Sequence, residues 1–420
     1  MDNLNQYIPG SSHLVDYCIE HLGAEVIGSE ERPRETRPPF PCLTGASNTI
    51  NSLKIDRNLY PHIVAAGVDT VELNFGVAEY RQPDMFKQLN EAKSGAVCAG
   101  YKGRRGIAVE LFGQEFMVQA RGSRGGYEYL LQNGDIQLQM MPDARGGKPS
   151  PELRVIFRSP YLWRVGEVGA YNEVVKFLNE CAFLEYCKVS RADLCADRVM
   201  PLPEINRKTQ VVSILREKDS YYGGDFQRGQ RDTGFQFGRG GIACRLYDKA
   251  YEISVKGQGH IMPLWMVKGW DGEGAVCRFE VQLRRKGLRL FDATMDFATF
   301  EDSKADIWAY GTNRVLRIVN PGSATRKERA EVTDYWKDYQ SCAGLFGERG
   351  GVLPHKELSP DWLPLVKQAG GCLASAWARL AADVGEGTAT LILENEWGRR
   401  IPDKVIEGGL LQKARFVHLS

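Results

Sequence analysis

Residues 190–199 read SRADLCADRV, residues 242–253 read IACRLYDKAYEI, and residues 277–285 read CRFEVQLRR. Each stretch alternates charged or polar side chains with small or apolar ones, the period of two that is typical of β-strands. We therefore predict three strands that bury one face and leave the other face polar. The side chains predicted on the polar face are Arg191, Asp193, Cys195 and Asp197; Arg245, Tyr247, Lys249 and Tyr251; and Arg278, Glu280, Gln282 and Arg284.

The surrounding sequence extends this pattern to a whole fold. Residues 68–77 and 151–159 alternate in the same way, whereas residues 83–92 and 171–186 have apolar residues near helical spacing. After residue 300 the sequence becomes helical in pattern and carries tryptophan. Together these patterns predict an α+β fold: an antiparallel sheet with helices packed on one face and an open polar catalytic face, followed by a mainly helical C-terminal region.

A chain of 420 residues is long enough for two or three domains. Residues 1–58 are expected to form an N-terminal extension, because the segment ERPRETRPPFP is too rich in proline and charge for a stable helix or central strand. We expect the sheet domain to span residues 59–300 and the helical region to span residues 301–420.

The composition excludes several classes of protein. The chain has 54 Lys and Arg against 53 Asp and Glu, so a globally basic binder is excluded, although local basic surfaces are not. No apolar run is long enough to span a membrane, and the first residues do not have the pattern of a secretory signal. The ten cysteines form no C-x-x-C pair, which favours reduced thiols and a cytoplasmic location.

The side chains of the predicted polar face suggest a chemistry in combination. Carboxylates at alternate strand positions can bind Mg²⁺ or Mn²⁺, and arginines beside them suit phosphate oxygens. A tyrosine in such surroundings can attack phosphorus if its phenolate is stabilised. This combination is consistent with metal-assisted phosphodiester transesterification. Each element alone has a plainer interpretation, since Asp193 and Asp197 can be structural ion pairs and Tyr247 an ordinary strand residue.

Histidine is scarce in this sequence. None of the six histidines lies two residues from another, so a His-x-His pair that could hold a metal is absent. A metal would therefore have to be held by carboxylates.

Three segments in this order resemble the replication initiation factor family, which comprises rolling-circle initiators of plasmids and filamentous phages and relaxases of integrative elements. The segments are VSRADLCADR, GFQFGRGGIACRLYDKAYE and CRFEVQLRRKGLR, within a region of residues 65–320. Two features depart from the family pattern. Arg198 stands where the family usually has phenylalanine, and FQFGRGGIAC differs from the usual sequence before the YDK motif.

The resemblance implies a role for each matched position. Tyr247 would be the nucleophile that forms a 5′-phosphotyrosine and leaves a free 3′-OH. The other implied roles are metal ligation by Asp193, Glu280 and Asp197, stabilisation of the scissile phosphate by Lys249 and Arg245, and DNA contacts by Arg191, Arg278, Arg284, Arg285 and Lys286.

The expected partner is therefore a single-stranded or hairpin DNA origin, with a host or element helicase as a further partner. The sequence leaves two alternatives open: a conjugative relaxase of the same chemistry, or a non-catalytic DNA-binding regulator on the same scaffold. Residues 278–289 have a net charge of +4, and residues 314–329 are also basic. These clusters suit a phosphate backbone, but they are equally consistent with ordinary surface charge.

Overall fold

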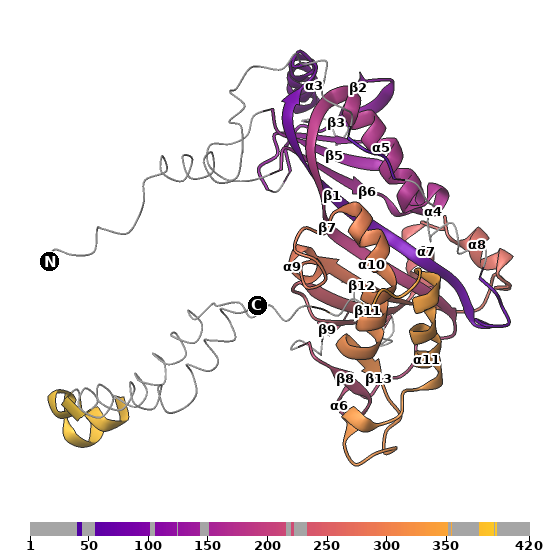
Figure 1. Ribbon diagram of the computed structural model, residues 1–420, viewed down its shortest axis with the longest axis vertical. Coiled ribbons are helices and arrows are strands. Elements are labelled where there is room, and N and C mark those ends of the chain that lie inside the picture. The colour runs from indigo at the N-terminus through magenta and orange to yellow at the C-terminus, as the bar shows by residue number, and fades with distance from the viewer. Residues whose placement is uncertain are drawn as a thin grey trace, which may run out of the picture.

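An antiparallel sheet of eleven strands dominates the described part of the chain (Figure 1). The computed structural model describes residues 40–43, 55–100, 106–123, 125–142, 151–215, 220–221, 233–351, 354, 378–389 and 391–392. In spatial order the strands are β2 (Ile107–Leu111), β3 (Gln114–Val118), β4 (Tyr129–Gln132), β5 (Ile136–Met140), β6 (Leu153–Phe157), β1 (Ile63–Tyr80), β7 (Ala182–Val199), β12 (Val276–Arg284), β11 (Ile242–Asp248), β10 (Gly234–Phe237) and β9 (Ser220–Tyr221). The predicted antiparallel sheet is confirmed.

Strands β1 and β7 form the spine of the sheet. Each has 18 residues, which corresponds to a length of roughly 60 Å. Strand β6 pairs with the second half of β1, and β12 pairs with the second half of β7. The spine therefore joins two halves of the molecule, one built on β2–β6 and the other on β12 and β11 (Figure 1).

Helices cover one face of this sheet along both halves. They are α3 (Met85–Gly100) and α5 (Glu167–Cys181) in one half, and α10 (Phe297–Tyr310) and α11 (Asp334–Ser341) in the other. The core of the second half centres on Phe279 of β12, whose ring lies 5.5 Å from that of Trp308 and 4.8 Å from that of Trp336. Stacking of Tyr171 on Phe297, with ring centroids 4.3 Å apart, connects the two groups of helices. The prediction of helices on one face is confirmed.

Three short helices lie at one end of the opposite face. They are α4 (Ser159–Val165), α7 (Lys249–Lys256) and α8 (Met262–Val267). Trp265 of α8 packs edge-on against Trp270, and both belong to a small second core with Ala65 and Val276 of the sheet. This small core covers the end of the polar face at which β12 begins.

Two predicted elements change type along their length. The helix predicted over residues 171–186 ends at Cys181, because the residues from Ala182 onward pair with β1 as the start of β7. The strand predicted over residues 242–253 ends at Asp248, whose carboxylate caps helix α7 by accepting a hydrogen bond from the Tyr251 backbone N–H at 2.9 Å.

The described part of the region after residue 300 is mainly helical, as predicted, but it also contains a strand. Following α10 and a turn of π-helix at Gly311–Val315, β13 (Leu316–Ile318) pairs with β8 (Val211–Ser213), which follows helix α6 (Arg207–Gln210). The domain boundary predicted at residue 300 falls inside α10, and the division into domains stays a prediction. The predicted helix at the C-terminal end is described only in part, with residues 378–384 helical.

Little of the predicted N-terminal extension lies within the described residues. In residues 40–43, the backbone N–H of Phe40 donates to the Asn179 side chain and that of Leu43 donates to the Asn172 side chain, both on α5. This short segment is therefore fastened to the helical face.

Two general expectations can be compared with the described residues. No helix among them is long and apolar enough to cross a bilayer. Eight cysteines are described as free thiols, six of them buried and two exposed.

Candidate functional site

The strand register aligns the polar side chains of three neighbouring strands. Arg245 of β11 lies opposite Glu280 of β12, and Tyr247 lies opposite Arg278. In the next pairing, Arg278 lies opposite Asp197 of β7. Residues directly opposite each other in an antiparallel pair share a face. The predicted grouping of these side chains on one face is therefore confirmed.

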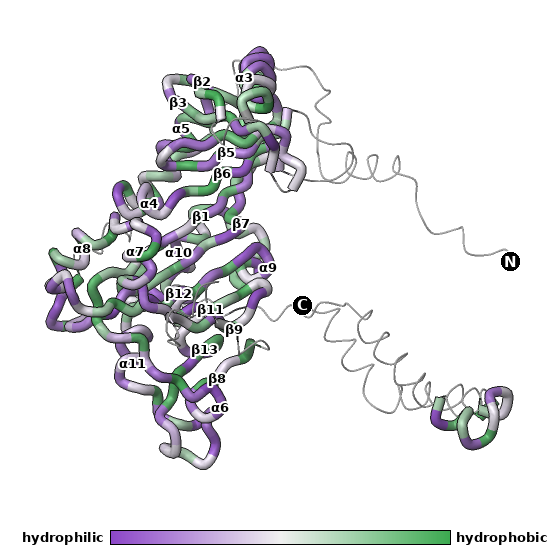
Figure 2. Tube along the Cα trace, turned by 180° about the vertical axis from the view of Figure 1, so that it is seen from behind, coloured by the Kyte–Doolittle hydropathy of each residue, from purple (hydrophilic) through white to green (hydrophobic). Residues whose placement is uncertain are grey.

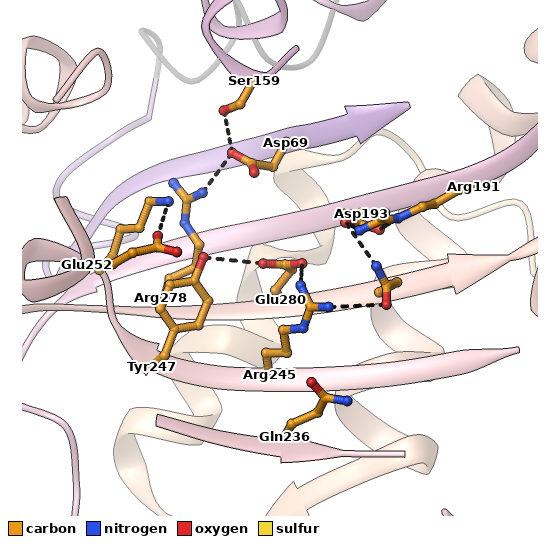
Figure 3. A network of polar contacts seen from close by, with 12 residues as sticks. Asp69, Ser159, Arg191, Asp193, Gln236, Arg245, Tyr247, Glu252, Arg278 and Glu280 are labelled. Carbon is orange, nitrogen blue, oxygen red and sulfur yellow. Dashed lines mark hydrogen bonds and ion pairs between the residues drawn. The ribbon is translucent and has the colours of Figure 1, made fainter. Parts of the chain in front are cut away.

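Hydrogen bonds connect these side chains across the strands (Figure 3). Tyr247 Oη donates to Glu280 Oε2 at 3.3 Å, and Arg245 Nη1 donates to Glu280 Oε1 at 3.0 Å. Arg245 Nη2 then donates to Gln282 Oε1 at 3.4 Å, and Gln282 Nε2 donates to Asp193 Oδ2 at 3.2 Å. We call this set the tyrosine network.

The network continues on the far side of Asp193. Arg191 holds both oxygens of that carboxylate, with its Nε 3.0 Å from Oδ1. Arg191 also lies 3.5 Å from Glu72 of β1, which in turn is paired with Arg154 of β6. Arginines and acids therefore alternate across five strands.

A second cluster surrounds Arg278 at the covered end of the face. Its guanidinium binds Asp197 through two hydrogen bonds of 2.6 and 2.8 Å, and it reaches Asp69 at 2.7 Å. Trp265 Nε1 donates to Asp197 Oδ2 at 2.8 Å, the same oxygen that accepts from Arg278 Nη2. We call Arg278, Asp197 and Asp69 the buried arginine cluster.

Asp69 was missed by the sequence analysis. Strict alternation along β1 places it on the apolar face with Val71, but the pairing with β7 shifts register between Val68 and Thr70. This β-bulge leaves Asp69 without a partner in β7 and turns its carboxylate toward the polar face. An acid at an apolar position of an otherwise regular strand was the available signal.

Asp69 is also held from the side of α4. Ser159 Oγ donates to its carboxylate at 2.8 Å and Trp163 Nε1 donates at 3.0 Å. His260, in the turn before α8, lies with Nε2 3.0 Å from Ser159 Oγ. These hydrogen bonds connect α4, and through Ser159 also His260, to the bulge in β1.

Lys249 does not lie on a strand, contrary to the prediction, because α7 begins at this residue. Its ammonium nevertheless lies 5.7 Å from the centre of the Tyr247 ring, and it pairs with Glu252 at 2.6 Å. Tyr251 also belongs to α7, so the strand geometry expected for it is wrong.

The polar face is less open than the sequence indicated. Tyr247 and Glu280 are each 3% exposed, and Arg278 is fully buried. The side chains of Arg245 and Arg191 are 18% and 25% exposed. The prediction that Arg278 contacts a DNA backbone is therefore wrong for this conformation, because its donors are enclosed by Asp197 and Asp69.

Burial shifts the proton affinities of the tyrosine network. The pKa of Glu280 rises to about 7, first because the carboxyl is desolvated and then because the charge of Asp193 lies nearby, with Arg245 opposing both effects. Burial likewise raises the pKa of Asp193 in spite of Arg191. The pKa of Tyr247 lies well above its ordinary value because of burial and the charge of Glu280.

The buried arginine cluster has the opposite character. Burial tends to raise the pKa of Asp69, but the charges of Arg278 and Lys249 outweigh it and hold that pKa below its usual range. Burial lowers the pKa of His260, which favours the neutral imidazole.

The carboxylates of Asp193, Asp197 and Glu280, which were expected to hold a metal, are not arranged as the ligands of a metal ion. Asp197 and Asp193 each bind an arginine through both oxygens, and Glu280 accepts from Arg245 and Tyr247. A divalent cation would have to displace these donors. Over the described ranges, no three His, Cys, Asp or Glu side chains gather as a metal site. The need for a metal stays a prediction.

The remaining predicted DNA contacts lie where β12 ends. Arg284 and Lys286 are exposed there, and Arg284 lies opposite Arg191 in the register. Arg285, in α9 (Arg285–Leu288), instead donates to the backbone carbonyls of Ala293 and Thr294 at 2.7 and 2.9 Å. Arg284 and Lys286 are therefore exposed to solvent, whereas Arg285 binds the loop that contains Ala293 and Thr294.

Comparisons with known proteins add little to this geometry. No family model matches the chain, and no curated protein matches it. Among solved structures, a rolling circle replication initiator protein from Geobacillus stearothermophilus is similar at 14% identity and a TM-score of 0.40. The match covers 69% of this chain and 98% of that one. A similarity of this size establishes neither family nor mechanism, so function has to be inferred from this chain's own residues.

Proposed function

We propose that the chain is a DNA-nicking and -joining enzyme that starts rolling-circle replication, with Tyr247 as the nucleophile. The observation that supports this most directly is the 3.3 Å contact between Tyr247 Oη and Glu280 Oε2. Phenols with an ordinary pKa near 10 are weak nucleophiles at neutral pH, so a tyrosine nucleophile needs a base beside it. Glu280 occupies that place, and Arg245 and Lys249 lie close to the same two groups.

The proposed reaction exchanges one phosphate ester for another. Glu280 takes the phenolic proton as Tyr247 Oη attacks the phosphorus of the scissile phosphate. The bond from phosphorus to the 3′ oxygen breaks, and that oxygen takes up a proton to leave a free 3′-OH. The 5′ phosphate remains bound to the tyrosine, and attack by a 3′-OH on this ester reverses the reaction and joins the strand.

Positive charge near the phenol would stabilise the transition state of this ester exchange. The guanidinium of Arg245 and the ammonium of Lys249 can approach the phosphate oxygens as negative charge builds on them. Because the phenol is 3% exposed, the reaction requires the binding of DNA to uncover it. After nicking, a helicase from the host or the element would unwind the duplex from the free 3′-OH.

The same residues would serve a conjugative relaxase, which uses the same exchange of esters. A second candidate, a non-catalytic DNA-binding regulator, is favoured by a different observation. The phenol is buried, and each of Asp193, Asp197 and Glu280 is bound by an arginine. A scaffold that has lost its chemistry would show such closed ion pairs.

One experiment separates these candidates. The full chain is incubated with Mn²⁺ and a pool of hairpin oligonucleotides that have randomised single-stranded loops, and tyrosyl peptides are then examined by mass spectrometry. A nicking enzyme gives a 5′-phosphotyrosine adduct on Tyr247 that Tyr247→Phe lacks and Tyr251→Phe keeps. If the adduct persists in Tyr247→Phe, Tyr247 is not the nucleophile. If neither the wild type nor either variant forms an adduct, the result favours the non-catalytic regulator.

A further inference from the structure

A basic pocket lies outside the tyrosine network, between β8 and β13. It has a volume of about 550 Å³. Its lining has three cationic residues, one acid, two polar residues and two apolar ones: Arg314, Arg317, Lys327, Glu328, Ser213, Asn313, Val212 and Ile214. We call it the β8–β13 pocket.

Positive charge is concentrated around this pocket. Residues 206–215 carry two Lys and Arg and no acid, and residues 311–333 carry five Lys and Arg and two acids. These two segments therefore have a net charge of +5, in a chain whose total is +1. Such a local excess in a neutral protein indicates a surface for a polyanion.

The pocket is built on fixed positions. Arg317 Nη2 donates to the backbone carbonyl of Glu328 at 2.9 Å, and Lys327 Nζ donates to that of Lys208 at 3.1 Å. Both bonds are made to backbone carbonyls rather than to carboxylates, and the residues that line the pocket comprise three cations and one acid, Glu328. Arg314 is exposed at the rim of the pocket.

An apolar side chain stands beside these cations. Ile214 lines the pocket and is 61% exposed, so it offers apolar surface next to the charged groups. Nucleic acids present apolar sugars and bases beside their phosphates, so a basic pocket with an apolar rim suits them better than it suits a free anion.

The pocket also lies close to the strands of the tyrosine network. Leu215, which follows β8, lies against Gly238, where a Cβ would come within 2.9 Å of the leucine side chain. Gly238 belongs to the turn between β10 and β11, and β11 carries Tyr247. Figure 1 shows β8 and β13 next to the β9 edge of the sheet, at the end of the molecule opposite α3. In Figure 2, which views the molecule from behind, the same two strands again lie below β9 and β11.

We propose that the β8–β13 pocket binds the phosphodiester backbone of DNA that leaves the sheet on the β11 side. It is a second, non-catalytic contact that adds affinity without reading sequence. The choice of DNA as the ligand rests on the proposed function, but the pocket's contribution to binding does not depend on any chemistry at Tyr247.

The test measures DNA affinity in a protein that cannot nick. In a Tyr247→Phe background, Arg314→Gln with Arg317→Gln is compared with the parent by fluorescence anisotropy, using labelled single-stranded and duplex oligonucleotides. Removing two phosphate contacts should weaken binding roughly ten- to thirtyfold at about 0.1 M salt. It should also reduce the slope of log K against log salt by about 1.4 for single strands or about 1.8 for duplex.

Two controls make the result specific. Lys87→Gln with Lys176→Gln removes the same charge from exposed positions on α3 and α5, far from the pocket, and should leave the slope unchanged. Arg314→Lys keeps the charge and should keep most of the affinity. Thermal denaturation followed by circular dichroism checks that each variant is folded.

The outcomes are distinct. A larger loss for the single strand or for the duplex identifies which form the pocket takes. An unchanged slope in the double arginine variant overturns the proposal, and so does an equal loss in the lysine control. The proposal is also overturned if inorganic phosphate displaces the oligonucleotide completely and binds the protein as tightly as the oligonucleotide does. The pocket would then be a site for free anions. Failure of the proposed function would appear separately, in the adduct experiment.

Discussion

Tyr247 and Glu280 lie diagonally across adjoining strands, with Oη 3.3 Å from Oε2 and each residue only 3% exposed. This relationship joins a candidate nucleophile to a candidate base and also encloses both. Burial raises the pKa of each group, so the packing that positions the two side chains also sets the pH at which they lose their protons.

Tyr247→Phe should abolish nicking and adduct formation, because no other atom of this side chain can form the phosphate ester. DNA binding should stay within a few fold, and the free energy of unfolding should change by about 1 kcal/mol, the usual contribution of one hydrogen bond. Gel assays of nicking, anisotropy and urea denaturation measure the three quantities. The matched control is Tyr251→Phe on α7, which should nick at the normal rate.

The rate of nicking should rise with pH and level off above about 7, because Glu280 accepts the phenolic proton only when it is deprotonated. Glu280→Gln should remove both the activity and this dependence on pH. A nicking rate that does not vary between about pH 6 and 8 would contradict the assignment of Glu280 as base.

The stability of the protein should depend on pH through the same residue. The pKa of Glu280 is raised in the folded state, so the folded protein binds the proton more tightly than the unfolded chain. Its contribution to stability is present at low pH and is lost as pH rises through about 7, at a rate of at most about 1 kcal/mol per pH unit. Glu280→Gln should therefore gain stability relative to the wild type as pH rises, as measured by urea denaturation at several pH values.

Asp197→Ala should destabilise the fold by about 3–5 kcal/mol, because it leaves the buried charge of Arg278 partly uncompensated and removes the acceptor of Trp265. A surface control is Asp135→Ala, whose partner Arg164 is 58% exposed and whose loss should cost less than about 1 kcal/mol. Equal losses in the two variants would show that the arginine cluster is not the stabilising feature.

Addition of Mn²⁺ to the DNA-free protein should reveal no stoichiometric site at Asp193, because Arg191 holds both oxygens of that carboxylate. Electron paramagnetic resonance of free Mn²⁺ measures this directly, with Asp193→Asn as the comparison. A site that is present in the wild type and lost in Asp193→Asn would show that the cation displaces the arginine. Loss of nicking in EDTA would separately confirm the metal dependence expected from the sequence.

Part of this fold was predictable because it depends on local alternation. The strand period of two places Leu246 and Phe279 on the apolar face and Tyr247 and Glu280 on the polar one, whatever the rest of the chain does. The change from strand to helix after Asp248 could also have been predicted, since aspartate is a favoured N-cap residue. The predicted strand was instead continued beyond Asp248 to residue 253.

Other features depended on contacts between distant segments. The bulge turns Asp69 toward Arg278, 209 positions away, and the acid at an apolar position of β1 did not by itself reveal this partner. The pairing of β8 with β13 likewise joins segments about 100 residues apart.

The sequence by itself therefore determined that Asp193, Asp197, Tyr247, Arg278 and Glu280 share the polar face, since alternation along a regular strand is a local property of the backbone. It did not place Asp69, which a bulge turns to that face, or Lys249 and Tyr251, which belong to a helix. The tertiary structure decided how far those side chains are covered and which partners they have. Burial and pKa depend on short helices and a bulge that come from elsewhere in the chain, and only long-range packing brings them over Tyr247 and Arg278.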